Sequence, residues 1–139
     1  MNTAGYSQTP LAKKLGLKDG FIIRLINQPA YYFSLFTDLP PDLNIEDDTN
    51  VKKNFIHYFT TSKADLKQQL ILLKNELVQN GMIWVSWLKK TAKIQTDITE
   101  DTIRNHALSI GLVDIKVCAV DETWSGLKLV IPVKNRMKN

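Results

Sequence analysis

Several polar and charged side chains of this sequence stand where an α/β protein binds ligands. They lie at or just after the ends of the segments that we expect to be strands: Asn27, Gln28, Thr61, Ser62, Ser86, Lys89, Lys90, Asp121, Glu122 and Trp124. The carboxyl ends of parallel strands meet at one edge of an open sheet, and ligands bind outside that edge. Helices beginning near Pro29, Ser62 and Thr99 would add free N–H groups and positive dipole ends. Together with the lysines, these groups predict a site for a small anionic molecule.

Each of these residues also has a structural explanation, which is the simpler one. Ser62 and Thr99 are typical helix-capping residues, and lysines are usually solvated. Asp121 and Glu122 are adjacent carboxylates in an expected turn, which does not by itself aim both at one substrate. Trp124 is unusual in a turn, so its indole either stacks on a ligand or covers an edge of the core. Both roles of Trp124 stay open at this stage.

The sequence contains no motif for a metal or a nucleophile. His57 falls in an expected strand and His106 in an expected helix, and neither belongs to an HxxxH or Cys–His spacing. Cys118 is the only cysteine, so it has no partner for an internal disulfide. On a buried strand, a cysteine is more often a small apolar packing residue than a nucleophile. We therefore expect no metal site, and the sequence assigns neither a catalytic residue nor a cofactor.

The stretch MIWVSWLKK, from Met82 to Lys90, is the element around which the others are expected to assemble. Both of its alternating sets of side chains are mostly apolar, as in a strand that is covered on both faces. Further strands are predicted at residues 21–26, 43–45, 54–60 and 115–120. An antiparallel strand at residues 127–133, after the turn DETWSG, would close the sheet. The fold class is predicted to be a three-layer, Rossmann-like α/β sandwich with a mainly parallel sheet.

The first two helices are predicted from proline positions. Thr9 as N-cap and Pro10 as first helical residue indicate a short helix that ends at Gly16. Pro29 would open a second helix that continues through the aromatic residues to Leu35.

Two further helices are predicted from capping residues and apolar spacing. Ser62 caps the clearest one, with Asp65 at the reciprocal capping position, and regularly spaced leucines extend it to Gly81. Thr99 caps the last helix, which Gly111 ends.

Length and composition fit a single folded domain over residues 1–139, with frayed ends at residues 1–8 and 134–139. Hydrophobic residues make up 44% and charged residues 23%, as in soluble globular proteins. No apolar run approaches the length of a membrane span, and the N-terminus lacks the order of a signal peptide. We therefore expect a cytoplasmic protein that does not insert into a membrane.

The formal net charge is +4 at pH 7, which raises the question of nucleic-acid binding. The basic residues are dispersed, however, near positions 13–18, 89–93 and 134–138, with an acidic stretch at residues 46–48. No aromatic-rich basic motif accompanies them. A solvated basic surface is thus favoured over a nucleic-acid footprint.

Three segments of the sequence together resemble a known family of small bacterial proteins, the domain of unknown function 3052 family. They are TPLAKKLGLKDG near the start, WVSWLKK in the middle, and the long string from Thr96 to Ile131. The likeness is strongest from Trp84 to Ile131 and weak over residues 31–50. The family usually has proline where this chain has Leu88, so the turn after the central strand is expected to differ. The resemblance implies no activity and assigns no catalytic residue.

The order of strands and helices with a closing hairpin also resembles the C-terminal half of class I methyltransferases. Those enzymes follow their first strand with a glycine-rich turn that lets the backbone approach the cofactor. Here NQPAYYF follows residues 21–26 instead. The resemblance therefore implies a fold and leaves the activity open.

These observations favour a non-catalytic or regulatory module that binds a small anionic ligand or a protein partner. The alternative is a small enzyme of reduced methyltransferase-like type, against which the missing glycine-rich turn counts. A weak nucleic-acid binder is the third class, and steep salt dependence would identify it.

Overall fold

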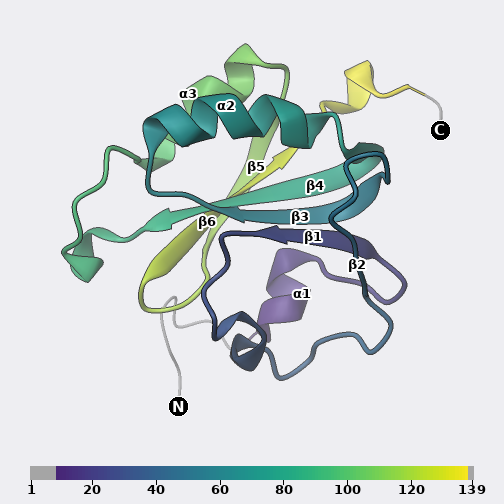
Figure 1. Ribbon diagram of the computed structural model, residues 1–139, viewed down its shortest axis with the longest axis horizontal. Helices are drawn as coiled ribbons and strands as arrows, with labels where there is room; N and C mark the ends of the chain where they lie inside the picture. The colour runs from purple at the N-terminus through teal and green to yellow at the C-terminus, as the bar shows by residue number, and fades with distance from the viewer. Residues whose placement is uncertain (1–8, 138–139) are drawn as a thin grey trace.

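The computed structural model describes residues 9–137. The strands in this range form one six-stranded sheet (Figure 1). The strands lie in the order β2-β1-β3-β4-β6-β5, with the bounds Ile22–Ile26 (β1), Asn44–Ile45 (β2), Lys53–Phe59 (β3), Leu77–Leu88 (β4), Val113–Ala119 (β5) and Trp124–Val130 (β6). β1 to β4 pair in parallel, and β6 is antiparallel to both of its neighbours. The predicted α/β class, with a mainly parallel sheet closed by an antiparallel strand, is confirmed.

Helices on both faces of the sheet complete the three layers. α2 (Lys63–Lys74) and α3 (Glu100–Ser109) lie on one face, as Figure 1 shows, and α1 (Leu11–Leu15) lies on the other. Residues 9–137 also contain three short 3-10 helices, with the bounds Tyr32–Leu35 (η1), Lys90–Ala92 (η2) and Val133–Asn135 (η3).

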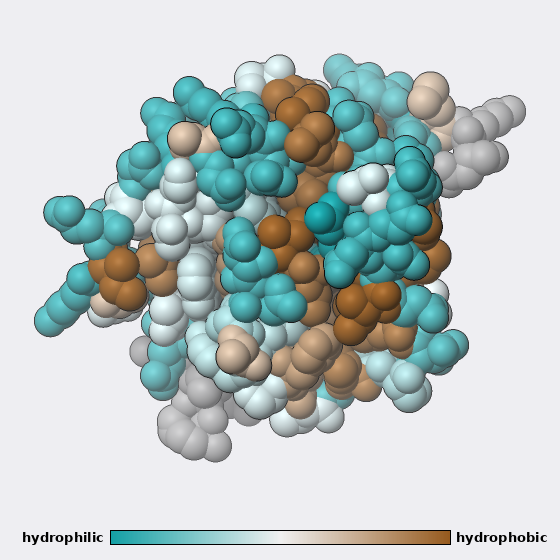
Figure 2. Space-filling view, in the orientation of Figure 1, coloured by the Kyte–Doolittle hydropathy of each residue, from teal (hydrophilic) through white to brown (hydrophobic). Residues whose placement is uncertain are grey.

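The sheet divides the core into two apolar clusters. The cluster below α2 and α3 contains Ile56 of β3 and Ile83 of β4, whereas the cluster below α1 and η1 contains Phe55 and Trp84 of the same strands. β3 and β4 therefore send alternate side chains into both clusters, which is why both of their faces are apolar. On the face shown in Figure 2, apolar patches lie between hydrophilic side chains.

The predicted N-caps of the two long helices are confirmed. Asp65 N donates to Ser62 Oγ at 3.2 Å, and Thr102 N donates to Thr99 Oγ1 at 3.2 Å. In α3 the capping box is completed by Thr102, whose hydroxyl accepts from Thr99 N. In α2 the carboxylate of Asp65 instead accepts a hydrogen bond from the Tyr58 hydroxyl of β3, so this side chain joins the helix to the sheet.

The predicted end of α2 at Gly81 was wrong, because the helix ends at Lys74 and Leu77 already belongs to β4. A leucine at this spacing suits both the buried face of a helix and a buried strand, so periodicity alone does not decide between them. Gly81 serves close packing within the strand. A Cβ atom there would lie 3.0 Å from the Lys53 carbonyl oxygen and 3.1 Å from Leu77 Cδ2.

The helix predicted to start at Pro29 was also wrong, since only the 3-10 turn η1 forms there. Tyr32 N donates to the Pro29 carbonyl at 2.9 Å, which closes a β-turn over residues 29–32. The ring of Tyr32 is fully buried against β3, and that packing competes with continuation as an α-helix. At α1, Pro10 rather than Thr9 occupies the N-cap position, and the helix begins one residue later than predicted.

In the closing hairpin, β6 begins earlier than predicted, and the turn is shorter. β6 begins at Trp124, so this residue is part of a strand, and the turn between β5 and β6 spans residues 120–123. Residues 134–137, which are part of the segment expected to fray, follow or belong to η3, and Met137 N donates to Gln79 Oε1 at 2.9 Å. The fraying expected at residues 1–8 and 138–139 concerns positions outside the described residues.

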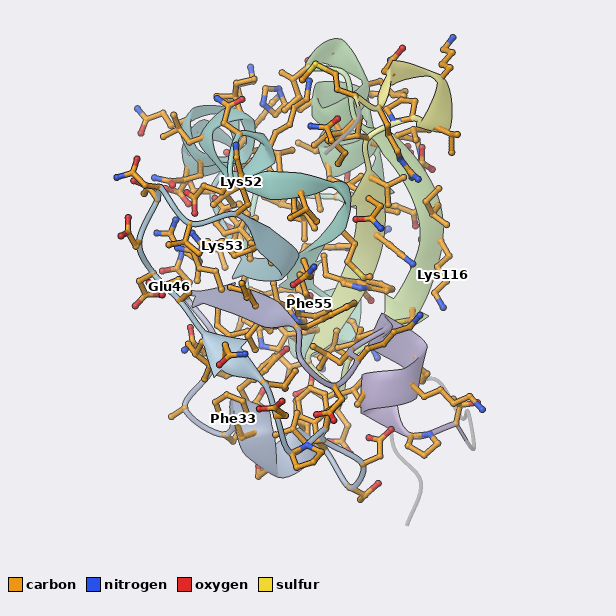
Figure 3. All side chains as sticks on the ribbon, turned by 90° about the vertical axis from the view of Figure 1, so that its right-hand side faces the viewer. Phe33, Glu46, Lys52, Lys53, Phe55 and Lys116 are labelled. Atoms are coloured by element: carbon orange, nitrogen blue, oxygen red, sulfur yellow. The ribbon has the colours of Figure 1, made fainter. Side chains whose placement is uncertain are left out.

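A buried group of charges joins β1, β3 and the connection from α2 to β4, and Figure 3 labels its member Lys53. The Lys53 side chain is fully buried, and its Nζ lies 2.7 Å from Glu76 Oε1. Arg24 Nη1 lies 2.6 Å from the other oxygen, Glu76 Oε2. Glu76 therefore pairs with both cations, and removing its charge would leave the buried Lys53 ammonium without a counter-charge.

We predict that Glu76→Gln lowers the free energy of unfolding by about 3 to 5 kcal/mol, because it leaves the buried Lys53 ammonium without a counter-charge. Urea denaturation measures this loss. The matched control is Glu122→Gln, an exposed carboxylate, which should change stability by no more than about 0.5 kcal/mol. Equal losses in the two variants would contradict the role assigned to Glu76.

Candidate functional site

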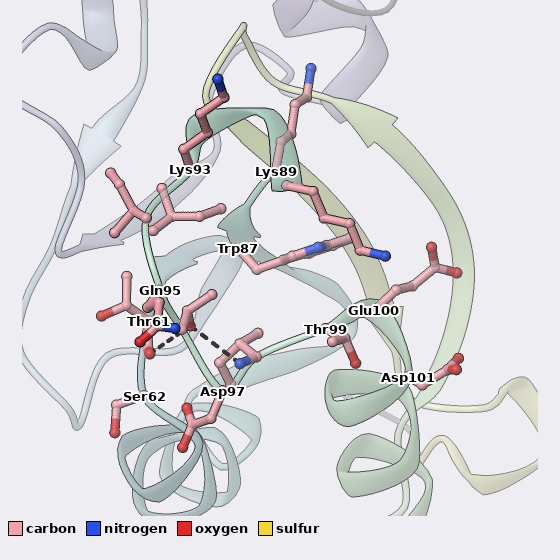
Figure 4. Close-up of a pocket in the computed structure, with 15 residues that line it drawn as sticks. Thr61, Ser62, Trp87, Lys89, Lys93, Gln95, Asp97, Thr99, Glu100 and Asp101 are labelled. Carbon is pink, nitrogen blue, oxygen red and sulfur yellow. Dashed lines mark hydrogen bonds between the residues drawn. The ribbon is translucent and has the colours of Figure 1, made fainter.

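An open cleft with a volume of about 1330 Å³ lies at the carboxyl ends of β3 and β4 (Figure 4). Its walls are the residues that follow these two strands, the crossover at residues 93–99, and the first turn of α3. The position agrees with the rule that open α/β sheets bind ligands outside the carboxyl ends of their strands.

The crossover is fixed to the start of α2 by two side chains. Thr96 Oγ1 donates to the Thr61 carbonyl at 2.7 Å, and Asp97 Oδ1 accepts from Lys63 N at 2.8 Å. Ile98 is buried in the core beneath the crossover. These contacts hold one wall of the cleft at a defined distance from the sheet.

Three lysines stand at the end of the cleft where β4 leaves the sheet. Figure 4 shows Lys89 and Lys93 extending from this same end, and Lys90 also lines the cleft. No ion pair formed within residues 9–137 involves any of the three. Burial lowers the pKa of Lys89, and the carboxylate of Asp121 opposes that shift.

The carboxylates of the opposite wall share one cation. Glu100 and Asp101, in the first turn of α3, both pair with Arg104, and Asp101 Oδ1 lies 2.7 Å from Arg104 Nη1. Hydrogen bonds to Glu100 and Asp114 raise the pKa of Arg104 further, so its charge is permanent. The cleft is therefore positive at the end where β4 leaves the sheet, and its acidic groups gather with Arg104 at the wall formed by α3.

The floor of the cleft is apolar. Trp87 and Leu88 of β4 are at most 9% exposed, and Ile98 closes the base. Ile94 of the crossover is 58% exposed at the opening. A ligand that covered this isoleucine would remove apolar surface from water, which favours binding.

Four of the residues predicted as ligand-binding line this cleft: Thr61, Ser62, Lys89 and Lys90. The helix N-terminus at Thr99, which was expected at the site, also lines the cleft. Sequence reasoning missed the crossover between β4 and α3. A crossover from β4 must pass the carboxyl end of that strand, and this requirement could have indicated the additional wall.

Asn27 and Gln28 lie instead at the point where the strand order reverses, between β1 and β3. Asn27 has a left-handed backbone, with φ of 59°, and its Nδ2 donates to the Phe59 carbonyl at 3.2 Å. This bond crosses the crevice between the two strand ends, and Gln28 is exposed beside it. The buried ring of Tyr32 packs below, edge-on to Phe59.

Ser86 lies inside the protein, in a chain of buried hydrogen bonds. Its Oγ is 2.7 Å from His57 Nε2, and His57 Nδ1 is 2.9 Å from the Tyr32 hydroxyl. All three residues are at most 1% exposed. Desolvation lowers the pKa of His57 to about 3 and raises the pKa of Tyr32, so both stay neutral near pH 7.

Asp121 and Trp124 organise the hairpin tip, and Glu122 is exposed beside them. Asp121 accepts hydrogen bonds from the N–H groups of Thr123 and Trp124 and from the Tyr31 hydroxyl, the last at 2.7 Å. The Trp124 indole packs edge-on against Phe59, with ring centroids 5.0 Å apart. It belongs to the cluster below α1, on the face opposite Trp87.

Residues 9–137 offer neither a membrane-spanning helix nor a metal-binding cluster. No helix there has the length and the apolar character needed to cross a membrane. No group of three or more His, Cys, Asp or Glu side chains in that range could hold a metal ion.

Solved structures with a similar fold include several methyltransferases. A candidate type 11 methyltransferase from Sulfolobus solfataricus is 14% identical, with a TM-score of 0.63 over 93% of this chain and 94% of that one. A SAM-dependent methyltransferase from Aquifex aeolicus is 15% identical, with a TM-score of 0.56 over 86% of each chain. Magnesium protoporphyrin IX methyltransferase from Synechocystis, solved with bound SAH, is 9% identical, with a TM-score of 0.56 over 83% of this chain and 75% of that one. At such identities the likeness shows a methyltransferase-like fold and nothing about activity.

The chain belongs to the family described as protein of unknown function (DUF3052), whose sequence profile matches residues 35–133. A comparison with curated proteins found no match. The resemblance recognised in the sequence is thereby confirmed, both for the family and for the fold.

We predict that the buried His57 makes stability depend on pH below neutrality. The unfolded chain takes up a proton at this residue near pH 6.5, whereas the folded protein does so only near pH 3. Stability is therefore present above pH 6.5 and is lost as the pH falls through this window, by up to about 1.4 kcal/mol per pH unit. Urea denaturation at several pH values measures the slope. The variant His57→Gln should lose this part of it, and an unchanged slope would contradict the assignment.

We predict that Trp124→Ala lowers the free energy of unfolding by about 1 to 3 kcal/mol, less than a fully buried tryptophan would, because the indole is only partly buried. Trp124→Phe keeps the ring contact with Phe59 and should recover most of the loss. Denaturation of the two variants measures the difference. A loss below about 0.5 kcal/mol in Trp124→Ala would show that the packing contributes little.

Proposed function

We propose that this protein is a non-catalytic module that binds a small amphiphilic anion in the cleft beside α3. The observation that carries the proposal is the combination of Lys89, Lys90 and Lys93, unpaired within residues 9–137, with an apolar floor. The anionic group would lie among the lysines. The apolar body would cover Trp87 and Ile94.

Electrostatics supports the anionic part of the ligand. The carboxylates of the cleft have partners of their own, since Glu100 and Asp101 pair with Arg104 and Asp97 accepts the first N–H of α2. The N-terminus of α3 adds N–H groups and a positive dipole end to the same cleft. A carboxylate, sulfonate or phosphate ester would thus meet positive charge at the end of the cleft that holds the three lysines.

The state of the acid and base groups supports a binding role without catalysis. A general acid or base needs a free side chain within hydrogen-bond reach of its substrate. Asp97, Glu100 and Asp101 are held by structural partners, and the His57 and Ser86 side chains are buried inside the sheet layer. Each of the five side chains therefore has a structural partner within the described residues.

A small enzyme of reduced methyltransferase-like type is the second candidate, because some structures of similar fold were solved with SAM or SAH. In open α/β sheets, ligand sites lie where the strand order reverses. In this chain the hydrogen bond from Asn27 to the Phe59 carbonyl crosses that crevice, and Tyr32 fills the space below. This arrangement favours the binding module over the enzyme.

The test uses two fluorescent probes of similar shape and different charge. 8-Anilinonaphthalene-1-sulfonate is an aromatic anion, and N-phenyl-1-naphthylamine is its uncharged analogue. We predict saturable binding of the sulfonate, with a dissociation constant that rises about tenfold in Lys90→Gln/Lys93→Gln, as expected for two lost charge contacts. The uncharged probe should bind both proteins equally.

The control variant is Lys18→Gln/Lys116→Gln, which removes the same charge away from the cleft. It should bind the sulfonate as the unmodified protein does. Unchanged sulfonate binding in Lys90→Gln/Lys93→Gln would overturn the proposed site. Saturable thermal stabilisation by S-adenosylmethionine, with methyl transfer to an acceptor, would show that the protein is a methyltransferase-like enzyme and overturn the proposal of a non-catalytic module.

A further inference from the structure

Two lysines face each other across neighbouring strands at the far side of the sheet. Lys116 of β5 and Lys128 of β6 are register partners in an antiparallel pair. Like charges directly opposite each other in such a pair destabilise a sheet. Lys128 is also the register partner of Trp84 in β4, whose Nε1 donates to the Leu15 carbonyl of α1 at 2.8 Å. The lysine pair therefore lies on the face that α1 covers.

α1 and the residues after it bring two further lysines to the same place. Lys14 Nζ donates to the Ala119 carbonyl at the end of β5, at 3.1 Å. Lys18 follows two residues after the C-cap of the helix. Burial lowers the pKa of Lys128, and repulsion from Lys116 and Lys18 lowers it further. We call Lys14, Lys18, Lys116 and Lys128 the lysine face.

The lysine face has no acidic counterpart within residues 9–137, because none of its members forms an ion pair there. The nearest acids along the chain are engaged elsewhere. Asp19 accepts a hydrogen bond from Asp42 N at 2.9 Å, and Asp38 accepts from the N–H groups of Ala12 and Lys13, each at 3.1 Å. The repulsion between the lysines is thus not relieved by carboxylates of the described chain.

We infer that the lysine face binds the phosphate backbone of double-stranded nucleic acid without regard to base sequence. Lysine ammonium groups contact phosphates as point charges, and neutralising them releases counterions from the duplex. Single strands are usually held by aromatic stacking as well, and the lysine face contains no aromatic member. An acidic protein surface would be expected to meet arginine and apolar anchors, which this face also lacks.

The four lysines come from segments about a hundred residues apart, so the charge pattern along the chain conceals them. The sheet order places β5 and β6 at one edge, and α1 packs against that part of the sheet. The proposal is independent of the cleft, which opens at the carboxyl ends of β3 and β4.

The test is fluorescence anisotropy with a fluorescein-labelled DNA duplex of about 20 base pairs, titrated from about 25 to about 200 mM salt. The logarithm of the binding constant should fall against the logarithm of salt concentration with a slope of about −3 to −4, as expected for up to four phosphate contacts. In Lys116→Gln/Lys128→Gln the slope should become shallower by about two units.

Two control variants remove equal charge elsewhere, Lys63→Gln/Lys67→Gln on α2 and Lys90→Gln/Lys93→Gln at the cleft. Both should retain the slope of the unmodified protein. Because the changes at β5 and β6 relieve a repulsion, Lys116→Gln/Lys128→Gln should unfold at no lower urea concentration. If that variant does not fold, Lys116→Gln alone at this exposed position should change the slope by about one unit.

Three results would overturn the inference. They are the absence of an anisotropy change at the lowest salt, an equal change of slope in all three double variants, and equal displacement of the duplex by poly-L-glutamate at the same charge concentration. The last result would point to an acidic protein partner. None of these outcomes bears on sulfonate binding at the cleft, so the two proposals fail separately.

Discussion

Burial of β3 and β4 on both faces is the constraint on which the rest of this structure depends. From Phe55 to Phe59, every side chain is at most 1% exposed, so the one strongly polar residue there, His57, must find its partners inside. Ser86 supplies one across the sheet and Tyr32 supplies the other from η1. The hydrogen-bonding requirement of a single imidazole thereby fixes the segment after β1 against the sheet.

The fixed position of η1 determines which part of the sheet edge is filled by the chain itself. With the Tyr32 ring packed on β3 and Asn27 bonded to the Phe59 carbonyl, the crevice at the reversal of strand order is occupied by the chain itself. The open cleft lies one strand further, where the crossover after β4 is held away from the sheet by Thr96 and Asp97. A methyltransferase-like fold thus offers a site with a different set of chemical groups.

Positive charge gathers in two regions of this fold, which approach each other where Lys14 and Lys89 repel. At the cleft, three lysines stand without an ion pair within residues 9–137, and at β5 and β6 the register brings Lys116 and Lys128 together. The formal net charge of +4 is too small to reveal either region. What matters physically is the local excess, because charges further apart than about 8 to 10 Å are screened at ordinary salt concentrations.

The sequence by itself determined the elements whose signals are local. Ser62 and Thr99 as caps, the two-sided apolar strands and the closing hairpin follow from hydrogen bonding and burial within a few residues, and they were enough to define the α/β class. Only the tertiary structure decided features that depend on distant partners. Burial of the Tyr32 ring replaced a helix by η1, and Leu77 joined a strand although its spacing also fits α2. The walls of the cleft and the lysine face depend on which strands become neighbours and in what register, and local sequence does not encode that choice because packing between segments far apart in the chain makes it.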